Sequence, residues 1–335
     1  MGRKTDGAGR SDWCYGRLGL SPAVHASLLV VVICGAGFIA HRKDVIKQGH
    51  STSLTNLLIK VLMPALIFSS ITQNETFLES NLVIMAPLMG FGFVCLSFAV
   101  SYILAKLFLR GELGDSENRR SFVTACGMHN YGFVAIPVIS TLYPNENLIG
   151  PLLMHNVGVE IAMWSVACST LKGKFDKKSL GQILNMPFVT VIFSLIVLFS
   201  GMYRYVPVFF SDAVSSVGKA AIPIGLILVG ATLSELFKEG LVEGSRSRMV
   251  RLLGLGIFNR QLLLPLIWFA LIAIIPMEPQ LKKIMYVQAA MPAAFFTIVL
   301  AKHFGGNVRT VAAVSVASFI LSPISISLWL SLGTP

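Results

Sequence analysis

The sequence predicts an all-α integral membrane protein in which ten transmembrane helices form a 5+5 inverted repeat. Hydrophobic residues make up 54% of the chain and charged residues only 13%, whereas a soluble domain carries roughly 25% charged residues. The apolar residues gather in ten stretches, and two of these stretches are interrupted by polar and helix-breaking residues in matching places. Composition, stretch length and the paired interruptions together give the fold class.

Each apolar stretch is close to the ~20 residues that a helix needs to cross the hydrocarbon layer of a bilayer. Nearly all charged residues fall between the stretches, because charge is costly inside hydrocarbon. The predicted spans cover residues 23–40, 54–72, 82–107, 121–142, 147–171, 182–202, 214–235, 249–275, 283–302 and 308–332. The chain then divides into a tail over residues 1–22, a first repeat over 23–171, a linker over 172–181 and a second repeat over 182–332.

The charges of the loops predict the orientation. Lys and Arg are concentrated in the loops after the odd-numbered spans, including the 172–181 linker. Because positively charged loops stay in the cytoplasm, we expect an integral protein of the cell membrane with both termini, and the tail over residues 1–22, on the extracytoplasmic side. Loops that face anionic lipid of the bilayer account for the net charge of +11, so no nucleic-acid partner is expected.

Matching prolines indicate an internal duplication. Pro64 in the second span and Pro223 in the seventh lie in similar apolar surroundings, and Pro137 and Pro292 follow them at similar separations. Each copy crosses the membrane five times, an odd number, so the two copies must insert in opposite orientations. Inverted repeats of this kind are common in secondary transporters. Coincidence among prolines, which are frequent in membrane helices, is the alternative.

The fourth and ninth spans are broken, by residues 127–137 (Gly-Met-His-Asn-Tyr-Gly-Phe-Val-Ala-Ile-Pro) and 288–292 (Gln-Ala-Ala-Met-Pro). Non-helical backbone persists at membrane depth only where protein or a water-filled cavity satisfies its polar groups. A break also creates a new helix N-terminus with partial positive charge, which suits a carboxylate. We therefore expect the two breaks to converge near the midplane on a binding site for a small anion.

Polar side chains in and near the first break supply candidate contacts. Asn130 carries an amide that can donate to a carboxylate and can also cap the broken backbone. His129 is either a carrier of a coupling proton or a neutral hydrogen-bonding residue, the interpretation that we favour. Glu160 is the one carboxylate deep in a span, and proton relay and structural hydrogen bonding both remain open for it. Asn156 lies one turn before Glu160, and His155 lies beside Asn156.

Other features of the chain favour structural roles and argue against an enzyme. Arg260 is expected to pair with an acid or a lipid headgroup. The five cysteines show no metal-ligand spacing, and no cluster of His, Cys and carboxylate residues has convincing metal spacing. A Walker sequence is also missing. We expect neither a cofactor nor a metal, and no ATP-driven step.

Around both breaks the sequence resembles the auxin efflux carrier family, which includes plant auxin exporters and bacterial organic-acid permeases. The resemblance covers residues 23–332. It rests on Asn130-Tyr-Gly-Phe-Val-Ala-Ile-Pro137, Gln288-Ala-Ala-Met-Pro292 with Ala301-Lys302, Leu62-Met-Pro64 and Asn185-Met-Pro187. It implies the fold of bile-acid symporters and plant auxin exporters, in which helices four and nine cross at their prolines. It also implies a scaffold domain and a moving transport domain, often in a homodimer.

The resemblance assigns roles to residues at the motif positions. Asn130 corresponds to the family's substrate-binding asparagine, and Pro137 and Pro292 to its crossover prolines. Plant exporters carry a further Asn where this chain has Phe188, and a Gln where it has Ala293. These departures favour a prokaryotic-type member that carries a small organic anion other than auxin. The predicted substrate contacts are Asn130, Tyr131, Gly132, Gln288, Met291 and Ala293.

The leading interpretation is a secondary-active carrier that moves a small monocarboxylate or dicarboxylate by an elevator-type motion. The nearest alternative is a sodium-coupled symporter of the bile-acid carrier type, although neither break contains a carboxylate to bind Na⁺. Two alternatives come from other classes. One is a membrane sensor that binds its ligand without transport, and the other is a membrane-embedded enzyme that uses Glu160, His155 and Asn156.

Overall fold

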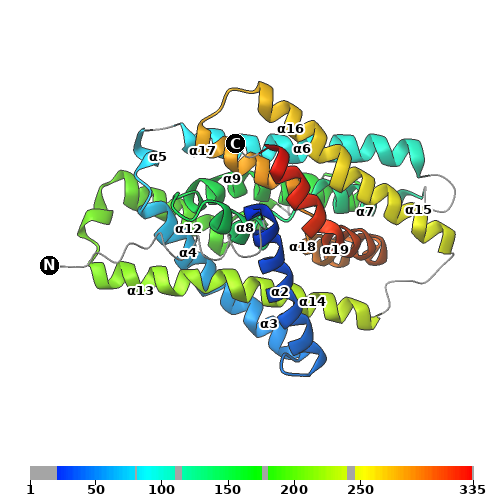
Figure 1. The fold of residues 1–335 in the computed structure, drawn as a ribbon, viewed down its shortest axis with the longest axis horizontal. Coiled ribbons are helices and arrows are strands. Elements are labelled where there is room, and N and C mark those ends of the chain that lie inside the picture. Colours follow the sequence, from blue (N-terminus) through cyan, green and yellow to red (C-terminus); the bar gives the residue numbers. More distant parts are fainter. Residues whose placement is uncertain (1–20, 80, 110–114, 176–179, 240–245, 334–335) are drawn as a thin grey trace.

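The computed structural model describes residues 21–79, 81–109, 115–175, 180–239 and 246–333, and every regular element within these ranges is a helix (Figure 1). The predicted all-α class is therefore confirmed for this part of the chain. Most of the predicted tail (residues 1–20) and part of the predicted linker (residues 176–179) lie outside the described residues.

Within the described ranges, six helical segments are long and apolar enough to cross a membrane, which supports an integral membrane protein. Three of them are joined from shorter helices. The six are Pro22–Arg42 (α2), Ser53–Thr72, Leu82–Phe108 (α6), Val208–Lys238, Val250–Ile274 and Val308–Gly333 (α19). The segment Ser53–Thr72 is made of the end of α3 (Gln48–Leu57), a π-helical turn (Leu58–Leu62) and α4 (Met63–Thr72). Val208–Lys238 is made of α13 (Val208–Lys219) and α14 (Ala221–Glu239). Val250–Ile274 is made of part of α15 (Arg246–Ile257), a π-helical turn (Phe258–Leu263) and α16 (Leu264–Ile274).

The remaining predicted spans are shorter or interrupted. The fourth consists of α7 (Ser116–Gly127) and α8 (Ala135–Leu142), and the ninth of α17 (Pro279–Ala290) and α18 (Phe296–Phe304). The fifth runs from α9 (Ile149–Ala162) through a π-helical turn (Met163–Ala167) into α10 (Cys168–Lys172), the sixth is α12 (Met186–Phe199), and α5 (Thr76–Glu79) is a single turn in a loop. The arrangement of ten spans in two inverted repeats therefore stays a prediction.

Local sequence explains where several of these helices begin. Asp115 caps α7, because its Oδ1 accepts the backbone N–H of Asn118 at 2.7 Å. Asn185 caps α12 in the same way, accepting the N–H of Phe188 at 2.9 Å, and Pro187 occupies the first turn, where no helical donor is needed. The start of α12 at Met186 is thus fixed by an Asn-Met-Pro sequence that stands in one of the apolar stretches.

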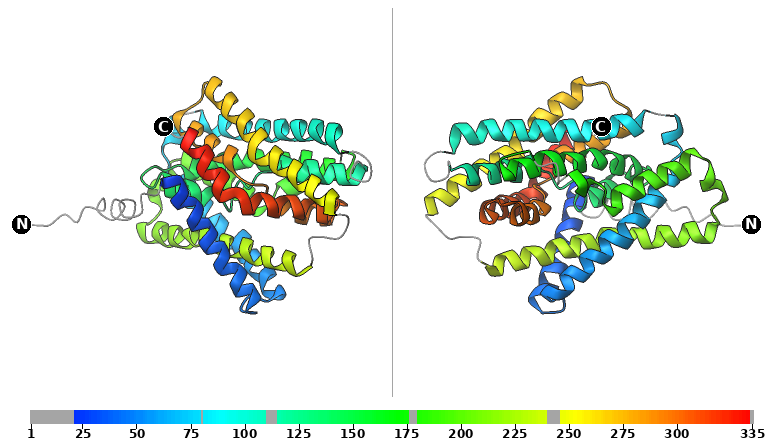
Figure 2. Two further views of the ribbon diagram at one scale, coloured as in Figure 1. Left: turned by 45° about the vertical axis from the view of Figure 1, so that its right-hand side comes forward. Right: turned by 180° about the vertical axis from the view of Figure 1, so that it is seen from behind.

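The helices form two groups that meet along a seam (Figures 1 and 2). In one group, which we call the α4 group, α4 packs against α12 and α13, and α2 packs against α14. In the other, the break group, α6 packs against α7 and α9, and α19 packs against α7 and α15. At the seam, α2 contacts α8 and α19, and α4 contacts α9. The views agree that α13 and α14 lie on the opposite side of the molecule from α6.

Reciprocal glycines allow α6 and α9 to approach closely within the break group. A Cβ at Gly90 of α6 would overlap the backbone carbonyl of His155, and a Cβ at Gly158 of α9 would overlap that of Pro87. Small residues let membrane helices bring their backbones together, where dispersion contacts stabilise the pair. The pair fixes the position of α9, the helix that carries Asn156 and Glu160.

Reciprocal glycines also allow a close helix approach in the α4 group. A Cβ at Gly37 of α2 would overlap the carbonyl of Ile227 in α14, and a Cβ at Gly230 of α14 would overlap the carbonyl of Cys34 in α2. Each group therefore contains at least one helix pair whose backbones approach this closely; in the α4 group, Gly218 of α13 also lies against the backbone of Leu66 in α4. We infer that these pairs make each group stiff.

We expect Gly90→Ala to lower the apparent Tm of the detergent-solubilised protein, because the added methyl group overlaps the carbonyl of His155. Overpacking of this kind costs about 1–3 kcal/mol. Gly92→Ala on the same helix is the matched control, since nothing lies within 4 Å of a Cβ at Gly92. Equal Tm values for the two variants would contradict the proposed role of the close approach.

Candidate functional site

The two helix breaks meet in the interior of the protein. Their backbones run antiparallel and form a single β-bridge between His129 and Ala293. The N–H of Asn130 donates to the carbonyl of Pro292 at 2.7 Å, and the N–H of Ala294 donates to the carbonyl of Met128 at 3.0 Å. All six residues are buried. Each break therefore satisfies polar backbone groups of the other, as buried groups away from water require.

A fully buried arginine joins the ends of the two half-helices that precede the breaks. Arg260 donates through Nε to the carbonyl of Met291 at 2.9 Å and through Nη1 to the carbonyl of Cys126 at 3.5 Å. These carbonyls stand at the C-terminal ends of α17 and α7, where a helix carries partial negative charge. The expectation that Arg260 pairs with an acid or a headgroup is wrong, because its partners are backbone carbonyls of the break group.

Pro265 accounts for the local structure around this arginine. It lies in the first turn of α16 and has no N–H to donate to the carbonyl of Gln261. The turn before α16 is π-helical, and Arg260 and Gln261 are both buried in it. The carbonyl of Gln261 instead accepts the indole N–H of Trp329 at 2.8 Å. Widened turns of this kind are frequent at functional sites.

The second break is also held by α19. Ser318 Oγ accepts the N–H of Ala293 at 3.0 Å, and Gln261 Nε2 donates to the same oxygen at 2.9 Å. Ser325 Oγ in turn donates to Gln261 Oε1 at 2.6 Å. Short polar side chains of α19 thus complete the hydrogen bonding of a segment that has lost its helical partners.

A cluster of amides gathers on the carbonyl of Tyr131 in the first break. Asn156 Nδ2 donates to this carbonyl at 3.1 Å and Gln288 Nε2 at 3.2 Å. Gln288 Nε2 also lies 3.1 Å from Asn156 Oδ1, and His155 Nδ1 lies 3.3 Å from the same oxygen. Gln288 of α17 and two neighbouring residues of α9 are therefore brought together, and they support the backbone of the break.

Asn130 and His129 have polar atoms without protein partners in the described part of the chain. Asn130 Oδ1 accepts the N–H of Val134 at 3.3 Å and so caps the start of α8, while its buried Nδ2 has no partner. Both ring nitrogens of His129 are likewise buried without a partner, and the ring packs edge-on against Trp268 with centroids 5.1 Å apart. Because buried donors are normally hydrogen-bonded, the Asn130 amide is available to a ligand or a water.

A small cavity with a mostly apolar lining and a few polar side chains lies beside the first break, at the seam between the two helix groups. Its volume is about 40 Å³, enough for a few water molecules. Tyr131, Gly132, Asn156 and Glu160 line it from the break group, and Met63, Ile67, Pro187, Phe188 and Val191 are among the residues that line it from the α4 group. An organic ligand of several heavy atoms would need this space to widen.

Glu160 connects the two helix groups across the cavity. Its Oε2 accepts a hydrogen bond from Asn185 Nδ2 at 2.8 Å, and Asn185 is the residue that caps α12. A structural hydrogen bond for Glu160, one of the two roles left open by the sequence, is therefore present. Among the residues that line the cavity, Glu160 is the one with an ionisable carboxylate.

The two half-helices that follow the breaks, α8 and α18, differ in how close their N-termini lie to the cavities. α8 begins three residues after the cavity-lining Gly132, and Pro137 in its first turn lines a second cavity of about 10 Å³, which also contains Met63 and Gly132. No described residue of α18 lines either cavity. Of the two N-terminal ends that we expected at the site, only that of α8 borders it.

The predicted site residues thus fall into three sets. Tyr131, Gly132, Asn156 and Glu160 line the cavity, and Gln288 and His155 contact the Asn156 side chain. Asn130 lines neither cavity, and its hydrogen bonds go to Val134 and Pro292. Met291 and Ala293 are fully buried and act through their backbones. Pro292 lies in the bridge between the breaks, whereas Pro137 lies in α8. Sequence reasoning missed Gln261 and Ser318, whose signal is a polar residue in an apolar span.

Among the described residues, no group of three or more His, Cys, Asp or Glu side chains is placed to hold a metal ion. Arg260 already donates to two backbone carbonyls at the paired breaks, those of Met291 and Cys126. This arrangement gives no support to the sodium-coupled alternative, in which carboxylates and carbonyls would surround the ion.

A helical membrane protein whose two broken helices pair inside the bundle, next to a small cavity, has the architecture of a membrane transporter. Residues 22–178 and 175–330 match the family of membrane transport proteins to which the auxin efflux carriers belong, so this chain is a member of that family. The resemblance found at the two breaks is thereby confirmed.

Two relatives from archaea extend along nearly the whole chain. An uncharacterized transporter of Methanocaldococcus jannaschii is 25% identical over 310 residues, which cover 90% of this chain and 96% of the relative. An uncharacterized transporter of Methanothermobacter thermautotrophicus is 25% identical over 310 residues, covering 90% of this chain and 95% of the relative. Their names support transport as the general activity.

We expect Arg260→Met to lower the apparent Tm strongly, because it leaves the carbonyls at the ends of α7 and α17 without a donor in a buried place. Such a loss costs about 1–3 kcal/mol per unsatisfied group. Arg251→Met is the matched control, since Arg251 also donates to a backbone carbonyl, that of Phe108 at 2.9 Å, but from an exposed position. Thermal unfolding in detergent measures both variants, and similar shifts would contradict the role assigned to Arg260.

Proposed function

We propose that this protein is a secondary-active transporter of a small organic anion, and that the anion binds at the cavity beside the first helix break. The observation that carries the proposal is the Asn130 side chain. Its Oδ1 caps α8 at 3.3 Å, while its buried Nδ2 has no described partner. A donor kept free at the N-terminus of a buried helix is suited to a carboxylate oxygen.

The electrostatics of the break support an anion over a cation. The N-terminal end of α8 carries partial positive charge next to Gly132 in the cavity wall. The buried guanidinium of Arg260 neutralises the negative C-terminal ends of α7 and α17. The partial charges that remain near the cavity from the broken backbone are therefore those of the α8 N–H groups.

The two helix groups suggest how the site reaches both sides of the membrane. The cavity and its smaller neighbour share Met63 and Gly132, one from each group, and both lie on the seam. Close-packed glycine pairs hold α2 to α14 and α6 to α9 within the groups. An elevator-type motion would move the break group, with its bound anion, along α4 and α12 while each group keeps its internal packing.

Glu160 is the group best placed to couple this motion to protons. When ionised, its carboxylate would repel an anion in the same small cavity. When protonated, it would lose that charge and could donate a hydrogen bond to the substrate or to Asn185. We therefore propose proton–anion symport in which Glu160 carries the proton, and in which its bond to Asn185 at 2.8 Å holds the empty cavity closed.

A substitution at Asn130 can separate its proposed role in substrate binding from its role in folding. We expect Asn130→Asp to keep an oxygen for the N–H of Val134 but to reduce organic-acid transport by at least about tenfold, the equivalent of one charge-assisted hydrogen bond. Thermal unfolding in detergent reports whether the variant is folded, since the new carboxyl group is buried. Uptake into proteoliposomes measures transport, and Asn147→Asp, at an exposed position, is the control. Unchanged transport by a folded Asn130→Asp protein would remove Asn130 from the substrate site.

We expect Glu160→Gln to uncouple transport from the proton gradient, because the amide keeps an oxygen for Asn185 but cannot release a proton. Uptake driven by a pH gradient should be lost while exchange of internal for external substrate continues. The assay uses K⁺ as the only alkali cation, so that coupling to Na⁺ would show as inactivity of the unaltered protein. The control is Glu146→Gln, since Glu146 pairs with Lys283 at 2.6 Å in an exposed position. Full gradient-driven uptake by Glu160→Gln would refute proton coupling through this residue.

A further inference from the structure

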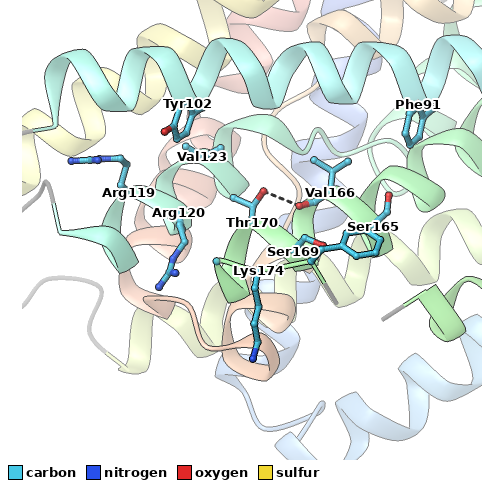
Figure 3. A pocket seen from close by; sticks show the side chains of 12 residues that line it. Phe91, Tyr102, Arg119, Arg120, Val123, Ser165, Val166, Ser169, Thr170 and Lys174 are labelled. Atoms are coloured by element: carbon cyan, nitrogen blue, oxygen red, sulfur yellow. Dashed lines mark hydrogen bonds between the residues drawn. The ribbon is translucent and has the colours of Figure 1, made fainter. Parts of the chain in front are cut away.

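A third and much larger cavity opens between α6, α7 and α10 (Figure 3). Its volume is about 640 Å³, within the range of roughly 300–1,000 Å³ that is usual for ligand sites. None of its lining residues lines the cavity beside the helix break, and none belongs to the α4 group. It is therefore separate from the proposed transport site.

The cavity has a positively charged end. Arg119, Arg120 and Lys174 line it, and no Asp or Glu is among its lining residues. The Nε atom of Arg120 is buried and has no hydrogen-bond partner in the described part of the chain. Arg120 Nη1 lies directly against Gly173, where a Cβ would overlap it. Gly173 has φ +70° and ends α10, so the chain turns there and leaves room for the guanidinium.

The other end of the cavity is apolar. Figure 3 shows Arg119, Arg120 and Lys174 towards one end and Phe91 towards the other, with Val166 between them. Phe91 and Tyr102 both lie on α6, and their separation in sequence corresponds to about 16 Å along the helix axis. This length is close to one leaflet of the hydrocarbon layer, half of ~30 Å. Tyr102 is 51% exposed, so the apolar wall reaches the lipid-facing surface of α6.

We propose that this cavity binds an anionic phospholipid, with its phosphate at Arg120 and Lys174 and one acyl chain along α6 towards Phe91. Guanidinium and ammonium groups bind phosphate through charge-assisted hydrogen bonds. A free phosphate would satisfy the charged end but would leave the apolar wall uncovered. In the orientation that the charged loops predict, the charged end faces the cytoplasmic leaflet, where anionic lipids are concentrated.

Such a lipid would act on the break group alone. Its headgroup would join α7, through Arg120, to the segment after α10, through Lys174, and α7 is the half-helix that leads into the first break. The site is independent of the proposed substrate and of proton coupling. Its failure in an experiment would leave the transport proposal untouched.

The test measures lipid binding to the purified full-length protein in detergent by native mass spectrometry. We expect phosphatidylglycerol to bind more tightly than phosphatidylcholine. The double variant Arg120→Gln, Lys174→Gln should bind phosphatidylglycerol about 25-fold more weakly, about fivefold for each charge removed. Lys106→Gln, at an exposed residue of α6 that does not line the cavity, is the control and should bind as the unaltered protein does.

A second variant probes the apolar end without changing charge. Val166→Phe should fill part of the cavity and weaken phosphatidylglycerol binding, while thermal unfolding without lipid reports whether each variant is folded. Three results would overturn the proposal. These are equal binding of phosphatidylcholine, phosphatidylglycerol binding by the folded double variant as tight as that of the unaltered protein, and complete displacement of the lipid by inorganic phosphate, which would assign the site to a soluble anion.

Discussion

The structure depends on how the broken backbone of two membrane helices is satisfied. Away from water, each unpaired N–H or C=O costs free energy comparable to a lost hydrogen bond. Here the two breaks pair with each other, through Asn130 with Pro292 and Ala294 with Met128. Because the pairing uses backbone atoms, the side chains remain free for other contacts: Tyr131 lines the cavity, and the Asn130 Nδ2 has no partner among the described residues.

Arg260 completes this arrangement from a third helix. Its guanidinium reaches the carbonyls of Met291 and Cys126, which belong to the two half-helices that end at the breaks. A fixed positive charge thus stands where two negative helix ends meet, and the aromatic face of Trp268 lies 5.9 Å from it. Arg260 is not among the residues that line the cavity, so it organises the two breaks without a place in the proposed anion site.

The breaks and the fold class could be predicted from the sequence, because both depend on the pattern of apolar and helix-breaking residues along the chain. Gly, His, Asn and Pro interrupt the apolar pattern at 127–137, and a related interruption occurs in the second half. The partners of the breaks could not be predicted in the same way, because the bonds of Arg260 and Ser318 go to backbone atoms and leave no complementary residue in the sequence. Which side chains face the cavity also depends on the irregular backbone after Gly127, where helical periodicity no longer applies. Tyr131 therefore lines the space, whereas His129, two residues earlier, packs against Trp268.

The bridge between His129 and Ala293 has a consequence for biosynthesis. The ribosome completes the first break long before it reaches the second, so the nascent amide of Asn130 and carbonyl of Met128 enter the bilayer before Pro292 and Ala294 exist. Until the C-terminal half arrives, that stretch can only remain near water, at the translocon or in a hydrated defect. The stretch between α7 and α8 thus gains its native backbone partners only after the second break has been made, although it is translated well before that break.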